Sequence, residues 1–372
     1  IQLDGGVLAP EPAASVGLPV SPADTGSAHP LDDGPHVFWA TDSQIQIFYL
    51  CDGEFLHSAP TEVRGTISFT GMCADSDAEY VVSNRAHKPG KEKVDGISRI
   101  FAVSDIHGEY EALVDLLEKA GVVDEDLSWS WGDGHLVILG DVFDRGAMVT
   151  ECLWLIHRLE REAAEEGGAV HYLLGNHELM ALRGDLRYVN SRYMEGIVAE
   201  VGIEYEDLFG PDMELGRWLR SKNTAIKLND VLFVHAGLGP EVVERGLSLQ
   251  DINEGVREGI DFRSYAFVFS EMPGFLYQSA GPVWYRGYHR DQDGWYSQAT
   301  MDDVEAVLDH FGATATVVGH TEVGQVEALY RGLVFGIDVP LERLGSFQAL
   351  LWEGGRSFRV LGNGRREPLS GS

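Results

Sequence analysis

Cysteine is scarce in this chain of 372 residues, and long apolar runs are lacking. The 3 cysteines are too few and too scattered for a disulfide framework or a zinc knuckle. Cys51 and Cys73 could pair in an exported protein, but we expect buried free thiols. Cys152 precedes an apolar helical run, so we interpret it as a core residue rather than a catalytic thiolate. No run of about 18 apolar residues occurs, so the sequence predicts no membrane span.

Basic residues are also scarce. The chain has 28 lysines and arginines against 59 acidic residues, which gives a formal net charge of -31. Such a negative surface repels the phosphates of nucleic acids at long range, so we expect no nucleic-acid partner. An anionic substrate must then be attracted by local positive charge, which bound metal ions supply.

Composition indicates one folded core between two polar ends. Hydrophobic residues make up 44% of the chain, which is ample for a packed core. We expect a flexible N-terminal tail over residues 1–36, a single domain over 37–362 and a C-terminal tail over 363–372. The chain begins at Ile1 rather than Met, and we interpret this as a mature N-terminus after signal removal. This interpretation favours a periplasmic or secreted protein over a cytoplasmic one, and we expect a monomer.

Strands dominate the N-terminal part, and strands alternate with helices from residue 99 onward. Runs rich in Val, Ile, Phe and Tyr predict the strands, and leucines on one face predict the first helix. Each alternating strand runs into a short polar motif, so we expect these motifs to meet at the carboxyl edge of an α/β sheet. The predicted strands are 37–39, 45–50, 65–69, 80–82, 99–103, 136–139 and 170–174, with helices at 110–120 and 147–166.

The second half of the chain predicts a less regular arrangement. Its elements are a polar, aromatic, cap-like insertion at 185–221, a hairpin of 225–228 with 231–234, a long loop at 265–290, a helix at 302–310, a strand at 314–318, and antiparallel strands to about residue 361.

Metal-binding side chains occur in the first of five short motifs. In 104–108, Asp105 and His107 leave a strand end two positions apart and point the same way. This mixture of oxygen and nitrogen ligands suits a divalent transition metal. Alone, the motif could equally be a capping Asp and a surface His.

The motif at 140–146 adds two carboxylates and an arginine on one turn. Asp141 directly follows a strand and could bridge two ions, while Arg145 could bind phosphate oxygens in bidentate fashion. A turn stabilised by Asp144 and Arg145 is the alternative, but it leaves Asp141 without a role.

Three further motifs complete the set. In 175–178, Asn176 is a neutral ligand that preserves net positive charge for an anion, and His177 can protonate a leaving oxygen. His235 and His320 each follow an apolar strand. A lone histidine at such a position would more often be structural, but five motifs with metal-binding side chains, each after a predicted strand, favour a two-metal site. Mixed oxygen and nitrogen ligands suit manganese, iron or zinc better than calcium.

These five motifs, in this order, resemble the phosphoprotein phosphatase family within the calcineurin-like metallophosphoesterases. The motifs at 104–108 and 282–287 resemble the bacterial, Shewanella-like members of that family. Ser104 stands where the family usually has glycine, and Ala236 is a second departure. The resemblance implies an α/β (α+β) fold, a four-layer α/β/β/α sandwich of two mixed β-sheets flanked by helices, over residues 37–362.

The resemblance also implies roles for the motif residues. Two divalent ions, Mn, Fe or Zn, would be held by Asp105 and His107 at the first position and by Asn176, His235 and His320 at the second, with Asp141 bridging both. Substrate phosphate would be bound by Arg145, Arg286 and Asn176. His177 would act as general acid, oriented and kept protonated by Asp144.

The implied activity is that of a metal-dependent phosphomonoesterase. We expect a protein phosphatase for phosphotyrosine, phosphoserine or phosphothreonine, or for a small phosphoester, using in-line attack by a hydroxide that bridges the metals. The alternative enzyme is a dinucleoside polyphosphate hydrolase of the diadenosine tetraphosphatase kind, and the non-enzymatic alternative is a metal-binding scaffold. Five aromatic residues could stack on a phosphotyrosine ring or pack among themselves: Tyr188, Tyr193, Phe275, Tyr277 and Tyr285.

Overall fold

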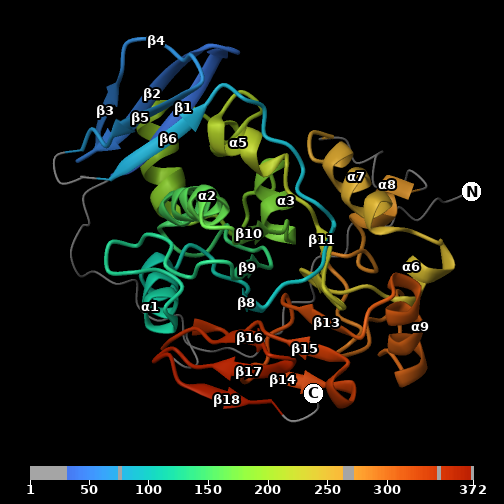
Figure 1. Cartoon of the computed structure of the whole chain (residues 1–372). Coiled ribbons are helices and arrows are strands. Elements are labelled where there is room, and N and C mark those ends of the chain that lie inside the picture. The colour runs from blue at the N-terminus through green and yellow to red at the C-terminus, as the bar shows by residue number, and fades with distance from the viewer. Residues whose placement is uncertain (1–31, 74–77, 263–271, 342–344, 370–372) are drawn as a thin grey trace, which may run out of the picture.

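Two six-stranded mixed β-sheets form the centre of this computed structural model, which describes residues 32–73, 78–262, 272–341 and 345–369 (Figure 1). In the first sheet, three parallel strands continue into three antiparallel ones. Its order is β10 (Ala169–Tyr172), β9 (His135–Ile138), β8 (Arg99–Val103), β16 (Ala349–Glu353), β17 (Arg356–Val360) and β18 (Arg366–Pro368).

The second sheet has parallel strands at its centre. β12 pairs in parallel with β13, and β13 pairs in parallel with β15. In each case the chain between the two strands crosses back to the end of the sheet at which the first strand began. Its order is β14 (Glu327–Leu329), β15 (Val334–Gly336), β13 (Ala315–Val318), β12 (Val231–Val234), β11 (Ala225–Leu228) and β7 (Lys93–Val94).

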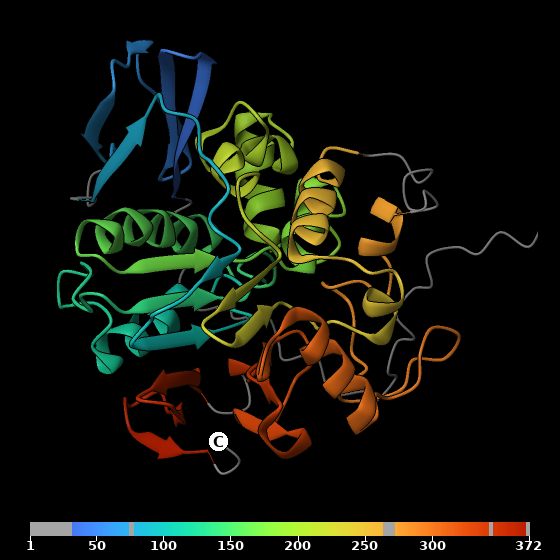
Figure 2. The same cartoon turned by 45° about the vertical axis from the view of Figure 1, so that its right-hand side comes forward.

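The sheets pack face to face, with helices on their outer faces. Apolar side chains from both sheets form one buried cluster, which includes Ala102 and Val137 of the first and Phe233 and Val317 of the second. α2 (Val149–Glu165) packs against β10, as the green helix of Figure 2 shows, and α7 (Leu249–Gly259) packs against β11. The expected α/β fold of two mixed sheets flanked by helices is confirmed.

Most predicted elements are present. α1 (Tyr110–Ala120) has the predicted bounds and ends at Gly121, whose φ of 74° places it in the left-handed region that favours glycine. α9 (Met301–Phe311) is also confirmed. Helices that were not predicted include α6 (Pro240–Glu244) and α7.

The N-terminal strands form separate small sheets. β1 (Asp33–Thr41), β2 (Gln44–Cys51), β3 (Glu54–His57) and β4 (Thr61–Glu62) form one, and β5 (Thr66–Thr70) pairs with β6 (Glu79–Ser83) in another. β1 includes residues 33–36 of the expected N-terminal tail, where the side chains of His36 and Asp33 form a buried hydrogen bond. At the other end, β18 lies within the expected C-terminal tail.

The expectation of three free thiols is wrong. Cys51, at the end of β2, forms a disulfide with Cys73, which follows β5, and their Cα atoms are 5.3 Å apart. The two positions are 22 residues apart in sequence, and only the pairing of the N-terminal strands brings them together. Cys152 is buried on α2 as a free thiol, as predicted.

The segment 185–221 differs from the predicted cap. It contains a π-helix (Arg192–Val198), α4 (Ala199–Val201), a 3-10 helix (Tyr205–Phe209) and α5 (Glu214–Leu219). Tyr193, Tyr205 and Trp218 are at most 1% exposed and belong to the main core. Its aromatic residues therefore reflect core packing, although Tyr188 is exposed.

The long loop predicted at 265–290 is interrupted by a helix. Residues 263–271 lie outside the described part of the chain, and α8 (Met272–Leu276) follows them.

The helices of the described residues include no candidate membrane span, since none combines sufficient length with sufficient hydropathy.

Replacing both Cys51 and Cys73 by Ser is expected to destabilise the fold by about 3 kcal/mol, because the disulfide restricts a loop of this length in the unfolded chain. Urea denaturation, followed by tryptophan fluorescence, measures the change. We also expect dithiothreitol to lower the unfolding midpoint of the wild type but not that of the double variant. Equal unfolding midpoints for the two proteins would contradict the prediction.

Candidate active site

Both sheets direct the ends of parallel strands to one edge, and the predicted ligands lie there. Asp105 and His107 follow β8, Asp141 follows β9, and Asn176 begins α3 (Asn176–Leu182) after β10. Histidines follow the parallel strands β12 and β13 of the second sheet. We call these six residues, all at most 9% exposed, the candidate metal centre: Asp105, His107, Asp141, Asn176, His235 and His320.

Asp141 lies at the middle of the centre. Its Oδ2 is 3.2 Å from Nε2 of His235 and 3.8 Å from Nε2 of His177. Two groups of potential ligands share this carboxylate, one with His107 and His177 and one with His235 and His320; within each group the ligand atoms lie within 4.8 Å of one another. A carboxylate that belongs to two groups has the position of a bridging ligand.

Asn176 and Asp105 complete the arrangement. Oδ1 of Asn176 is 2.9 Å from Nε2 of His235. The carboxylate of Asp105 accepts hydrogen bonds from the backbone N–H of His320, at 3.0 Å, and from the hydroxyl of Ser104. Ser104, the departure from the usual glycine, thus orients a predicted ligand.

The residues present fit divalent metal ions. Nε2 of His320 is buried and has no hydrogen-bond partner within the described structure. Nδ1 of His107 and Nδ1 of His235 donate to the carbonyls of Phe143, at 2.8 Å, and Leu139, at 2.6 Å. These bonds leave Nε2 of each ring facing the centre, as in metal-binding histidines generally.

Charge within the centre is balanced among the side chains. Burial favours a neutral Asp141, but His235 and His177 outweigh it and hold the pKa of Asp141 well below its usual range. Burial also opposes a charged His235, yet Asp141 raises its pKa to about 9. Burial lowers the pKa of His107 to about 3. The proton on His235 therefore compensates the negative charge of Asp141. A metal cation bound between the two side chains could replace this proton.

The loops that present these residues are strained. Of the eleven non-glycine residues with positive φ in the described chain, six belong to the motifs. Such conformations cost about 1–3 kcal/mol each and persist only where surrounding contacts enforce them. The six are Asp105, His107, Asp141, Asp144, Arg145 and His320.

Glycine is required where two loops cross the centre. A Cβ on Gly175 would lie 2.2 Å from Oδ1 of Asp141, and one on Gly319 would lie 2.5 Å from Oδ2 of Asp105. Both distances are shorter than any van der Waals contact, so larger residues would displace the predicted ligands.

Glu178 has a positioning role that the sequence analysis missed. Its buried carboxylate accepts hydrogen bonds from the backbone N–H groups of Asp141, Val142 and Gly175 at 2.7–2.9 Å. It also accepts one from the hydroxyl of Tyr172 at 2.9 Å. A glutamate three residues after a helix N-cap was the available signal, since this position commonly binds nearby backbone N–H groups.

His177 and Asp144 form a pair beside the centre. Nδ1 of His177 lies 2.6 Å from Oδ2 of Asp144, and both side chains are buried. Burial lowers the pKa of His177, but Asp141 and the bond to Asp144 outweigh it, so the pKa is raised overall. The ring of Tyr188, which is 38% exposed, lies 5.4 Å from that of His177.

The predicted arginines flank the centre. Arg145 is exposed, and its backbone is fixed by bonds with the carbonyl of Tyr188, at 2.9 Å, and the side chain of Asn190, at 2.7 Å. Arg286 donates from Nη1 to the carbonyl of His320 at 2.7 Å. Arg290, the alternative in the same loop, is exposed.

A shared carboxylate between two groups of buried histidines, at the meeting edge of two facing sheets, defines a metallophosphoesterase with a candidate binuclear site. Residues 98–324 match the family described as calcineurin-like phosphoesterase, and the chain belongs to this family.

Solved and curated relatives agree with this assignment. The crystal structure of a cold-active protein-tyrosine phosphatase from a psychrophilic Shewanella species is 36% identical, with a TM-score of 0.83 over 91% of this chain and 99% of that one. Shewanella-like protein phosphatase 1 of Plasmodium berghei (strain Anka) is 29% identical over 60% of this chain, and the match spans 61% of its own length. Shewanella-like protein phosphatase 2 of Arabidopsis thaliana is 26% identical over 66% of this chain and 70% of its own length.

The variant Glu178→Gln is expected to weaken metal binding by about 10–100-fold, because an amide cannot accept all the bonds that position the loop of Asp141. Metal content after equilibration with graded concentrations of manganese measures the effect. Glu165→Gln, at an exposed position of α2, is the matched control and should bind metal like the wild type. Wild-type affinity in Glu178→Gln would contradict the positioning role.

Proposed function

We propose that this protein is a phosphomonoesterase that acts on phosphorylated protein side chains, phosphotyrosine among them. The observation that carries the proposal is the convergence, at one edge, of two ligand groups sharing Asp141 with the His177–Asp144 pair. The high structural similarity to a protein-tyrosine phosphatase supports the same substrate class.

The candidate metal centre would hold two divalent ions. Asp105 and His107 would bind one, Asn176, His235 and His320 the other, and Asp141 both. When bound, such ions act as Lewis acids on phosphoryl oxygens and lower the pKa of water. The mixed oxygen and nitrogen ligands favour manganese, iron or zinc.

The remaining residues would bind and orient the phosphoester. Arg145, from the motif at 140–146, and Arg286, from the motif at 282–287, would bind the phosphoryl oxygens and neutralise their charge. The side-chain amide of Asn176 would be a further phosphate contact. His177, whose Nδ1 is held by Asp144, would donate a proton from Nε2 to the leaving oxygen. This donor allows an alkoxide or phenoxide to leave as a neutral alcohol.

An exposed aromatic side chain beside the site supports phosphotyrosine as a substrate. Phe275, Tyr277, Tyr285 and Tyr193 are at most 9% exposed, so of the five aromatic candidates only Tyr188 is exposed beside the site. A phosphotyrosine ring whose phosphate lies near His177 would reach the ring of Tyr188. We further propose an extracytoplasmic location, because disulfides such as Cys51–Cys73 form mainly in oxidising compartments.

Initial-rate measurements on the manganese-loaded protein test the proposed activity. The panel comprises phosphotyrosyl and phosphoseryl peptides, p-nitrophenyl phosphate and diadenosine tetraphosphate. We expect the highest kcat/KM for a phosphopeptide. A preference for diadenosine tetraphosphate would overturn the proposal in favour of a dinucleoside polyphosphate hydrolase, and no turnover of any substrate would favour a scaffold.

Arg286→Ala is expected to lower kcat/KM for the best phosphopeptide by about 10–100-fold, the range for losing a charge-assisted hydrogen bond to phosphate. Arg290→Ala, four residues away, is the matched control and should retain wild-type kinetics. Metal content is measured for both variants, because Arg286 also binds the backbone of His320. Equal losses in the two variants, or none in Arg286→Ala, would remove Arg286 from phosphate binding.

A further inference from the structure

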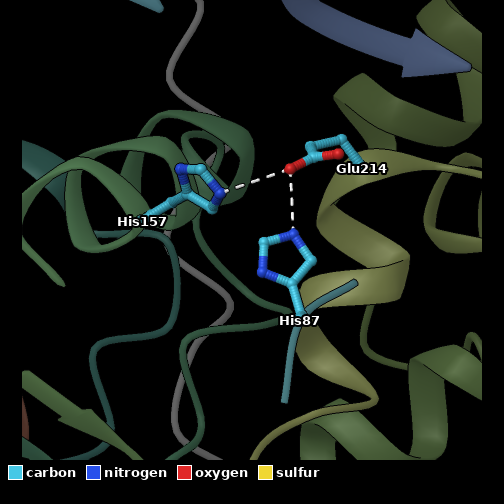
Figure 3. Close-up of side chains that lie close together, drawn as sticks. All are labelled: His87, His157 and Glu214. Carbon is cyan, nitrogen blue, oxygen red and sulfur yellow. Dashed lines mark hydrogen bonds and ion pairs between the residues drawn. The ribbon is translucent and has the colours of Figure 1, made fainter. Parts of the chain in front are cut away.

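A second group of metal-ligating side chains shares no residue with the candidate metal centre. It consists of His87, His157 and Glu214, whose ligand atoms lie within 4.8 Å of one another (Figure 3). His87 lies in the segment between β6 and β7, His157 lies on α2, and Glu214 begins α5. No role in the phosphatase reaction was assigned to any of them.

The spacing of the three ligand atoms suits a single ion. Nε2 of His87 is 2.9 Å from Oε1 of Glu214, and Nε2 of His157 is 3.6 Å from the same oxygen. Two ligands bound at about 2.0–2.1 Å to one tetrahedral zinc ion lie about 3.4 Å apart, so small side-chain movements suffice. Both rings in Figure 3 direct a nitrogen at one carboxylate oxygen.

Surrounding groups hold these side chains in place. The other oxygen of Glu214, Oε2, accepts a hydrogen bond from Nε1 of Trp39 at 2.6 Å, which fixes the carboxylate. The ring of His157 packs edge-on against Trp154 and Trp218, at centroid distances of 5.2 and 5.5 Å. Orientation of ligands by neighbouring groups is a general property of metal sites.

Charge and access are also suitable. Burial favours a neutral Glu214, but hydrogen bonds from His157 and His87 outweigh it and lower the pKa of Glu214 to about 2, so the carboxylate is ionised at neutral pH. The side chains of His87 and His157 are 23% and 13% exposed, so solvent reaches both rings.

We propose that His87, His157 and Glu214 form a further zinc-binding site, with water as the fourth ligand. Two histidines, one glutamate and one water are a donor set that zinc uses in proteins. The ion would join three segments that are distant in sequence. Because Trp39 of β1 is bonded to the same carboxylate, the ion would also fasten the N-terminal sheet to α2 and α5.

Zinc content tests the proposal. Wild-type protein and His157→Gln are saturated with zinc, dialysed, and analysed by inductively coupled plasma mass spectrometry. We expect about one zinc ion per chain fewer in His157→Gln, and unchanged phosphatase turnover. His310→Gln is the control for a histidine outside the site, because His310 is exposed and its Nε2 lies 2.9 Å from the carbonyl oxygen of Leu247.

Crystals of the wild type, grown with zinc, give an independent result from anomalous scattering. An anomalous peak between His87, His157 and Glu214 would support the site. A peak at the candidate metal centre alone, together with equal zinc content in wild type and His157→Gln, would overturn it and leave a hydrogen-bond network. If His157→Gln does not fold, the zinc content per chain is measured in His87→Gln instead, which changes the more exposed ligand.

Discussion

The constraint on which the rest of the site depends is the burial of a charged carboxylate. Asp141 is 1% exposed, and an isolated buried carboxylate would cost several kcal/mol. The backbone N–H of His177 and the ring of His235 compensate this charge directly. The carboxylate of Glu178 fixes the backbone of Asp141 by accepting a hydrogen bond from its N–H. Glu178 is itself buried, so the site contains a second buried carboxyl group. Burial raises the pKa of Glu178, and Asp141 raises it further.

Two sheets are needed because no single strand edge supplies enough ligands. The first sheet contributes the oxygen donors and His107, and the second contributes two imidazoles. The apolar cluster between the sheets sets their separation, and therefore the distance between the two sets of ligands. Packing within this cluster thus supports the strained motif loops, whose positive φ angles would otherwise relax.

Sequence patterns predicted the two central sheets, and the polar motifs that follow the parallel strands do lie together at one edge, because strand ends and motifs are adjacent in the chain. They failed where the decisive contact is long-range. The pairing of Cys51 with Cys73 depends on the register of several strands, and the aromatics of 185–221 were interpreted as a cap although Trp218 packs in the core. α7 was missed despite a local signal, the reciprocal bonds between Ser248 and Asp251 at its N-terminus.

The attachment of β1 has a consequence for the order of folding. Nε1 of Trp154 donates to the carbonyl of Pro35, 119 residues earlier, and Trp39 reaches Glu214 across 175 residues. Contacts of such sequence separation form slowly, because closing a long loop costs entropy before any contact compensates it. During synthesis, β1 therefore leaves the ribosome before α2 and α5, and its contacts with Trp154 and Glu214 cannot form until those helices have been made.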